Sequence, residues 1–202
     1  MLLSEIQFEI FSSESIAIIG PSGAGKSTLL GILAGLDVPS TGDVILDGES
    51  IFELDEDGRA QLRGKMIGFV FQSFQLLPSL TALENIMLPL ELLNLPNQKE
   101  MAEHVLERVG LAGRAGHYPR QLSGGEQQRV AIARAFAVQP KMLLADEPTG
   151  NLDKKTGEKI IELLFSLNEE QGTTLVLVTH DNQLADRCQR QFHIDGGCFQ
   201  EL

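Results

Sequence analysis

Short apolar runs alternate with stretches of helical spacing along this chain. The runs cover residues 15–19, 141–145 and 174–179. Continuous apolar runs of this length predict strands that are buried on both faces of a parallel sheet. Between the strands, residues 26–36 place apolar side chains at helical spacing, at Leu29, Ile32, Leu33 and Leu36. The alternation predicts an α/β fold with a mainly parallel core sheet and crossover helices.

Two turn signals predict a small antiparallel component beside that sheet. Asp47-Gly48 lies within residues 43–51, and Asp195-Gly196-Gly197 lies within residues 191–202. Asp-Gly and Gly-Gly pairs between short extended segments are typical of hairpins. We therefore expect one hairpin in each of these two segments.

A long helical pattern interrupts the alternation between residues 73 and 137. Four prolines punctuate it, at Pro78, Pro89, Pro96 and Pro119. We expect a single domain over 1–202, because this length suits one domain and leaves little room for two. Within it, a core subdomain would comprise 1–72 and 138–202, and a helical subdomain would span about 73–137.

Composition bears on the partners and the location that we expect for this protein. The chain carries 28 acidic and 16 basic residues, a formal net charge of −12. Since affinity for nucleic acid comes mainly from clustered Lys and Arg, we expect no nucleic-acid partner. Cys188 and Cys198 fit neither a CxxC motif nor a zinc site. With no signal-peptide pattern and no membrane-spanning run, a cytoplasmic location is expected.

A glycine-rich loop follows the first predicted strand and leads into the first predicted helix. It has the pattern GxxxxGK followed by Ser or Thr, in the strand–loop–helix context that this motif requires. Glycines let backbone N–H groups point at a triphosphate, and the helix N-terminus adds a positive end. We expect Lys26 to reach the β- and γ-phosphates and the Ser27 hydroxyl to bind Mg²⁺. This phosphate loop comprises Gly20, Pro21, Ser22, Gly23, Ala24, Gly25, Lys26, Ser27 and Thr28.

Two carboxylates, Asp146 and Glu147, stand at the end of the predicted strand over 141–145. Ligands of open α/β sheets bind at the carboxyl ends of the strands, so the pair should face the phosphate loop. Asp146 is then placed to hold Mg²⁺, and Glu147 to orient or deprotonate the attacking water. The alternative is a pair of solvated acids, which the neighbouring phosphate loop makes the weaker interpretation.

A second candidate cradle for an anion lies in the Leu-Ser-Gly-Gly-Glu-Gln segment at residues 122–127, here called the signature segment. A hydroxyl at Ser123, compact glycines at Gly124 and Gly125 and a helix N-terminus can together bind a phosphate. The same residues, with Glu126, also fit a capping box that serves only the helix. One nucleotide rarely needs two cradles in one chain, so the second is expected to serve the nucleotide of another subunit.

Taken together, these motifs resemble the ATP-binding subunits of ABC transporters over essentially the whole chain. The resemblance implies a P-loop NTPase fold, an ABC-type nucleotide-binding domain with a small antiparallel β subdomain and an inserted α-helical subdomain. It also implies a catalytic set of Glu147, His180 and Gln72, in which Gln72 senses Mg²⁺ and water and His180 lies near the γ-phosphate. The Mg²⁺ ligands would be Ser27, Gln72 and Asp146. ATP contacts would extend to Ser123, Gly124, Gly125, Glu126 and Asp153, the last within the D-loop at 151–153.

The finer resemblance implies partners. Segments 68–78 and 145–153 are similar to the branch that contains lipoprotein-releasing, macrolide-export and cell-division ATPases, and 156–168 is most similar to YbbA-like subunits. Such a subunit would dimerise with a second copy around two ATP molecules, on the inner face of the cell membrane. It would drive an integral-membrane permease that exports or extracts a hydrophobic or lipid-like substrate, or transmits force to the periplasm.

Three questions stay open at this level. An apolar cluster after Gln72 is either core packing or a groove for a helix of the membrane subunit; it comprises Phe74, Leu76, Leu77, Pro78 and Leu80. The chain could also be a soluble ABC ATPase or a nucleotide-gated regulatory module, although it lacks long coiled-coil insertions, and Glu147 and His180 favour turnover. Finally, family members usually begin with an additional strand and an aromatic residue that stacks on adenine. Here Phe8 and Phe11 are expected on the following strand, so either the start is truncated or the base is held less tightly.

Overall fold

The computed structural model describes residues 3–202, which form a six-stranded sheet, a two-stranded sheet and the helices around them. The order of the large sheet is β4-β5-β6-β1-β7-β8, in which all neighbours are parallel except β7 and β8. Its strands are β1 (Ser15–Ile19), β4 (Ile67–Phe71), β5 (Met142–Asp146), β6 (Thr174–Thr179), β7 (Arg190–Asp195) and β8 (Cys198–Glu201). The predicted α/β class with a mainly parallel core sheet is confirmed.

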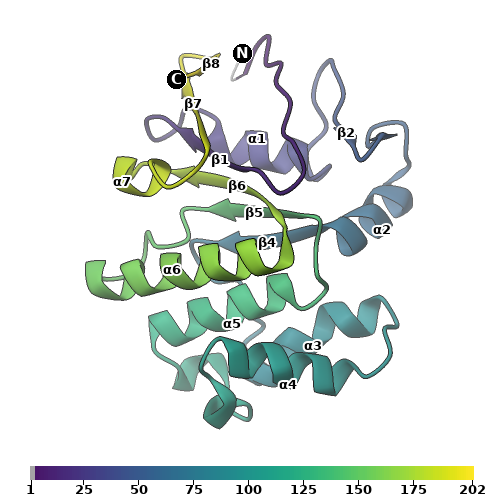
Figure 1. Cartoon of the computed structure of the whole chain (residues 1–202). Coiled ribbons are helices and arrows are strands. Elements are labelled where there is room, and N and C mark those ends of the chain that lie inside the picture. Colours follow the sequence, from purple (N-terminus) through teal and green to yellow (C-terminus); the bar gives the residue numbers. More distant parts are fainter. Residues whose placement is uncertain (1–2) are drawn as a thin grey trace.

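Both faces of this sheet are covered, as the continuous apolar runs predicted. Side chains of β1 alternate between two apolar cores, because successive residues of a strand point to opposite faces. Ile16 and Ile18 belong to the core that includes α1 (Lys26–Leu33). Ala17 and Ile19 belong to the core that includes α5 (Gly124–Phe136) and α6 (Lys154–Gln171). Figure 1 shows α5 and α6 side by side along the sheet.

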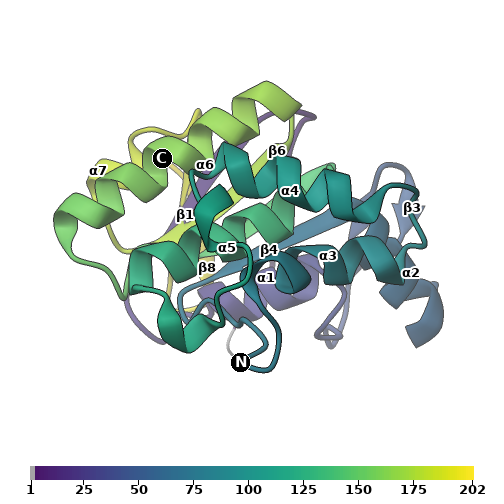
Figure 2. The same cartoon turned by 90° about the horizontal axis from the view of Figure 1, so that it is seen from below.

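Between β4 and β5 the chain is helical. The elements there are α3 (Ala82–Leu92), α4 (Gln98–Arg108), two short 3₁₀ turns at Ala112–Arg114 and Pro119–Gln121, and α5. Figures 1 and 2 place α3 and α4 at the end of the molecule away from α1, with α5 between them and the sheet. The remaining helices are α2 (Glu56–Met66) and α7 (Asn182–Ala185).

Both predicted hairpins are present. β2 (Ile45–Leu46) and β3 (Glu49–Ser50) pair in antiparallel fashion. Their turn uses left-handed backbone at Asp47 (φ 54°) and Gly48 (φ 84°), as a two-residue type I′ turn requires. The second hairpin joins β7 to β8 through Gly196 and Gly197, which are also left-handed.

The expectation that Phe8 and Phe11 lie on a strand is wrong. Residues 6–11 run without strand pairing, although Phe8 packs its ring on Phe192 and Phe199 at centroid distances of 5.3 and 4.7 Å. The strand β1 already pairs with β6 on one side and β7 on the other, so it offers this segment no free edge. The segment is held instead by side-chain packing of Phe8 on β7 and β8. Phe11 is 64% exposed.

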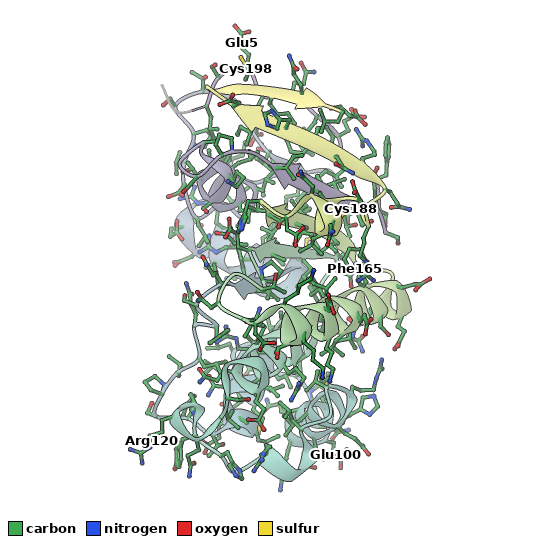
Figure 3. All side chains as sticks on the ribbon, turned by 90° about the vertical axis from the view of Figure 1, so that its left-hand side faces the viewer. Glu5, Glu100, Arg120, Phe165, Cys188 and Cys198 are labelled. Carbon is green, nitrogen blue, oxygen red and sulfur yellow. The ribbon has the colours of Figure 1, made fainter. Side chains whose placement is uncertain are left out.

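The two cysteines differ in environment. Cys198 is exposed on β8, whereas Cys188 is buried; Figure 3 labels both. Burial raises the pKa of the Cys188 thiol to about 12, so it stays protonated and chemically inert at neutral pH.

No helix among residues 3–202 combines the length and the apolar character needed to cross a membrane.

A buried asparagine fixes the loop between β4 and α3. The side chain of Asn85 is fully buried and accepts a hydrogen bond from the backbone N–H of Leu77 at 2.8 Å. Its amide donates to the carbonyls of Leu77, Leu80 and Thr81 at 3.2, 3.1 and 2.9 Å. One side chain thus holds three backbone positions, and α3 begins directly after them.

We predict that Asn85→Ala lowers the free energy of unfolding by about 2–3 kcal/mol, because it leaves several buried backbone groups without partners. Chemical denaturation measures this. The matched control is Asn182→Ala at an exposed position, where a change below about 0.5 kcal/mol is expected. Equal effects of the two substitutions would contradict the role assigned to Asn85.

Candidate active site

The carboxyl edge of the large sheet carries a cavity of about 410 Å³. Residues that follow β1, β4 and β5 converge there, because these strands are parallel and end at the same edge. The lining residues are Ser22, Gly23, Gly25, Lys26, Ser27, Thr28, Gln72, Asp146 and Glu147. The structure thus brings together most of the predicted phosphate loop, both predicted acids and Gln72.

The phosphate loop curls between the end of β1 and the start of α1. Gly23 (φ 81°) and Gly25 (φ 96°) have the left-handed backbone that glycine adopts most readily, and Gly25 is the N-cap of α1. No side chain of the described residues caps this helix, so its first N–H groups remain available for an anion. Lys26 is buried, and its ammonium donates to the carbonyls of Gly20 and Pro21 at 2.8 and 2.9 Å. The charge is thereby held over the loop.

The two acids at the end of β5 have different surroundings. Asp146 is the last residue of the strand, whereas Glu147 has left-handed backbone (φ 43°), which is strained for a residue with a side chain. The Glu147 N–H donates to the carbonyl of Val178 on β6 at 2.9 Å, and this bond holds the strained residue in place. Glu147 Oε1 lies 3.0 Å from His180 Nδ1. Strain at the position predicted to be the base is a second sign of function there.

The cavity also presents a set of oxygen donors. Ser27 offers a hydroxyl, Gln72 an amide oxygen and Asp146 a carboxylate. Hard oxygen ligands of this kind suit Mg²⁺, which takes few protein ligands and keeps several waters when it binds beside a triphosphate. The donor set therefore fits the expected ion.

Gln72 is joined to the D-loop. Its backbone carbonyl accepts a hydrogen bond from the Asn151 amide at 2.8 Å. Its own amide lies against Gly150, where an added Cβ would come within 2.5 Å of Gln72 Nε2. Asp153 is the N-cap of α6, with Oδ1 accepting from the N–H of Thr156 at 3.1 Å. Hydrogen bonds, first from the Thr156 side chain and then from its backbone, lower the pKa of Asp153.

The signature segment lies outside this cavity and caps α5. The N–H of Ser123 donates to Glu126 Oε2 at 2.8 Å, and the Ser123 hydroxyl accepts from the Glu126 N–H at 3.3 Å. The segment therefore forms a capping box. The bond from the Ser123 N–H, with Arg114 nearby, lowers the pKa of Glu126.

Close packing around the two glycines of the signature segment leaves little room for a side chain. A Cβ on Gly125 would lie 2.5 Å from Thr156 Cγ2 on α6, and one on Gly124 would lie 3.4 Å from Leu152 in the D-loop. These glycines let the start of α5 approach the D-loop and α6 closely. Ser123 at the start of α5 is exposed, whereas Gly125 is buried against α6.

A second hollow, of about 590 Å³, adjoins the first on the side of Glu147 and His180. It lies between the D-loop, α6 and α7, and its lining includes Asp153 and Arg187. His180 is largely exposed here, with 68% of its side chain accessible. His180 therefore faces the open side of this hollow, whereas Glu147 is 22% accessible.

One feature of the site has no signal in the sequence. Arg134 on α5 donates to the backbone carbonyls of Gln75 and Phe74 at 2.6 and 3.2 Å, just after Gln72. Burial lowers the pKa of its guanidinium, which stays charged at neutral pH. An arginine on a helix is ordinary in sequence, and only the fold shows that it reaches this loop.

Comparisons with known proteins agree with this geometry. The family model described as "ABC transporter" matches residues 3–150. The chain is 54% identical over 202 residues to an uncharacterized ABC transporter ATP-binding protein, YbbA, of Escherichia coli (strain K12), covering 99% of this chain and 89% of that protein. It is 49% identical over 201 residues to the lipoprotein-releasing system ATP-binding protein LolD of Bordetella pertussis, covering 98% and 87%.

Solved structures give the same result. A dimeric ATP-binding cassette in a post-hydrolysis state, bound to ADP and Pi, matches with a TM-score of 0.89 and 44% identity, covering 100% of this chain and 90% of that one. A dimeric bacterial ABC transporter cassette matches with a TM-score of 0.89, 45% identity and the same coverage. The resemblance to YbbA-like and lipoprotein-releasing ATPases is confirmed. The chain therefore belongs to the ABC transporter family and has the fold of its ATPase cassettes.

Proposed function

We propose that this ABC ATPase hydrolyses ATP between two copies of itself and passes the resulting motion to a membrane subunit. The observation that carries the proposal is the separation of the two phosphate-binding devices. The phosphate loop, Asp146 and Glu147 line one cavity, whereas the signature segment presents its helix N-terminus elsewhere on the surface. A second copy supplies the missing half of each site. Two matching structures of one ATP-binding cassette, both dimeric, support this arrangement.

ATP binding rests on the phosphate loop. Its backbone N–H groups and the N-terminus of α1 surround the β- and γ-phosphates, and Lys26 exchanges its two carbonyl partners for phosphate oxygens. Ser27, Gln72 and Asp146 hold Mg²⁺. When bound, the ion neutralises charge on the phosphate oxygens. Pro21, Ala24 and the rest of the loop give the backbone its curl.

Hydrolysis depends on Glu147 and His180. The water oxygen forms a bond to the γ-phosphorus while the bond from that phosphorus to the bridging oxygen of ADP breaks. Glu147 accepts the proton that the water loses. His180 lies within hydrogen-bond distance of Glu147 Oε1 and orients that carboxylate. The strained backbone of Glu147, held by Val178, keeps the carboxylate in the cavity.

The γ-phosphate controls whether the two copies stay together. In the closed dimer, Ser123, Gly124, Gly125 and Glu126 of one copy face the γ-phosphate held by the other, and Asp153 lies along the shared surface. Loss of the γ-phosphate removes the contact that favours the closed state, so the dimer opens. The open surface beside Glu147 and His180 provides the face that a second copy covers.

The membrane partner docks near the loop that follows Gln72. Leu76 packs into the apolar core, so part of the apolar cluster is core packing. Leu77, by contrast, is 43% exposed although Asn85 fixes its backbone. A rigid exposed apolar side chain beside Gln72 can receive a helix of a permease at the cytoplasmic face of the membrane. The name of the lipoprotein-releasing relative supports a lipid-like or hydrophobic cargo. Force transmitted to the periplasm is the alternative output of the same motor.

We predict that Glu147→Gln retains ATP binding and lowers turnover by at least about two orders of magnitude, because the amide keeps the shape but cannot accept the proton. Phosphate release under saturating ATP measures turnover, and a fluorescent nucleotide measures binding. The matched control is Glu169→Gln, an exposed position near the C-terminal end of α6 outside both hollows, which should hydrolyse ATP at the parent rate. Parent-level turnover of Glu147→Gln would exclude it as the base.

A second prediction concerns the docking surface. Leu77→Asp in the Glu147→Gln background should lose capture of a multi-span membrane protein from detergent-solubilised membranes, with unfolding free energy changed by less than about 0.5 kcal/mol. Leu92→Asp, an exposed position at the other end of α3, is the control and should capture as well as the parent. If Leu77→Asp captures the membrane protein as efficiently as its parent, the docking site lies elsewhere.

A further inference from the structure

The backbone two residues after Gln72 is held in an unusual conformation. Phe74 (φ 61°) and Gln75 (φ 48°) are both left-handed, although neither is glycine. Left-handed backbone is unfavourable for a residue with a side chain, so two such residues in succession persist only where other contacts hold them. The source of those contacts indicates what the conformation serves.

The contacts come from the helix that carries the signature segment. Arg134 on α5 donates one hydrogen bond to the carbonyl of Gln75 and another to that of Phe74, at 2.6 and 3.2 Å. A guanidinium presents several N–H donors in a fixed plane, so it can bind two adjacent carbonyls at once, which a single ammonium does less well. The strained turn is therefore bound to α5.

A second contact joins the same turn to the start of α5. The ring of Phe74 lies 3.7 Å from the position of a Cβ on Gly124, which is itself 3.4 Å from Leu152 in the D-loop. Phe74 and Leu152 thus both lie against the start of α5. Gln72, two residues earlier, is bonded to Asn151 of that D-loop.

We infer that Arg134 is a positioning residue that holds the loop after Gln72 against α5, the helix that carries the signature segment. The loop and the helix then move as one unit, which couples the two ATP sites of a dimer. The inference rests on the proposed function, in which Gln72 faces the nucleotide of its own copy and the signature segment faces that of the partner. Phe74 completes the connection. A change at Gln72 on loss of the γ-phosphate then moves the signature segment that serves the other ATP.

Arg134→Met tests this in dimers with one working site. Lys26→Met in one copy disables the site built on that copy's phosphate loop. In the first mixed dimer, the Arg134→Met copy keeps Lys26 and the other copy carries Lys26→Met, so the altered copy supplies Gln72 to the one working site. In the second, one copy carries both Arg134→Met and Lys26→Met, so the altered copy supplies only the signature segment to the working site. Two different tags purify each mixed dimer, and single-turnover phosphate release gives its rate.

Both arrangements should lose about tenfold in rate, as removal of a charge-assisted hydrogen-bond pair suggests, and Arg134→Lys should be intermediate. Arg134→Met should lower the unfolding temperature, because it removes two hydrogen bonds that hold the strained turn. The ATP affinity of the altered copy should nevertheless match the parent, which a general structural defect would not allow. If Arg134→Met unfolds below the assay temperature, Arg134→Lys is used alone. Arg108→Met, which removes an exposed arginine on α4 that pairs with Glu170, is the matched control and should change neither rate.

A loss confined to the arrangement that takes Gln72 from the altered copy would overturn the inference, because Arg134 would then serve only its own site. Unchanged rates in both would also overturn it. The reference is a mixed dimer with Lys26→Met in one copy and Arg134 intact. If that reference folds, binds ATP and releases no phosphate, the shared site itself fails, and the proposed function falls with the inference.

Discussion

Parallel pairing of the central strands is the constraint on which the rest of this structure depends. Because β4, β5, β6 and β1 are hydrogen bonded side by side in one direction, their carboxyl ends lie at one edge of the sheet. The residues that follow these strands, far apart in sequence, then share a single cavity. The same pairing continues one residue past β5, where the Glu147 N–H reaches the Val178 carbonyl and holds the strained acid beside His180.

A second constraint acts between helices. The start of α5 must approach the D-loop and α6 closely, and Gly124 and Gly125 allow it. The capping box satisfies the N–H groups of Ser123 and Glu126 within the chain, so the same serine serves the local helix and the proposed contact with a partner's phosphate. The Ser123 hydroxyl thus both stabilises α5 and takes part in the proposed contact with the phosphate. Capping of α5 and contact with a partner's phosphate would conflict only if the phosphate had to displace the Glu126 side chain from Ser123.

Much of the fold and the cavity follow from local patterns. The run at Thr174–Thr179 is a strand with those same bounds, and the Asp47-Gly48 turn forms as expected, because burial and turn chemistry act over a few residues. The error at Phe8 has a different origin: an extended apolar segment becomes a strand only if a neighbour has a free edge, and sequence does not show that β1 has none. Arg134 was missed for a similar reason, since its partners are carbonyls 59 and 60 residues away.

The central claim is that each ATP lies between two copies of the chain, and complementation of two inactive variants tests it most directly. Lys26→Met removes the phosphate loop's charge, and Ser123→Asp keeps a helix-capping side chain but repels phosphate. Each alone should be inactive, whereas an equal mixture should regain about one quarter of parent ATPase activity, since half the dimers contain one intact site. A mixture as inactive as either variant, with both folded and binding to each other, would contradict the shared site.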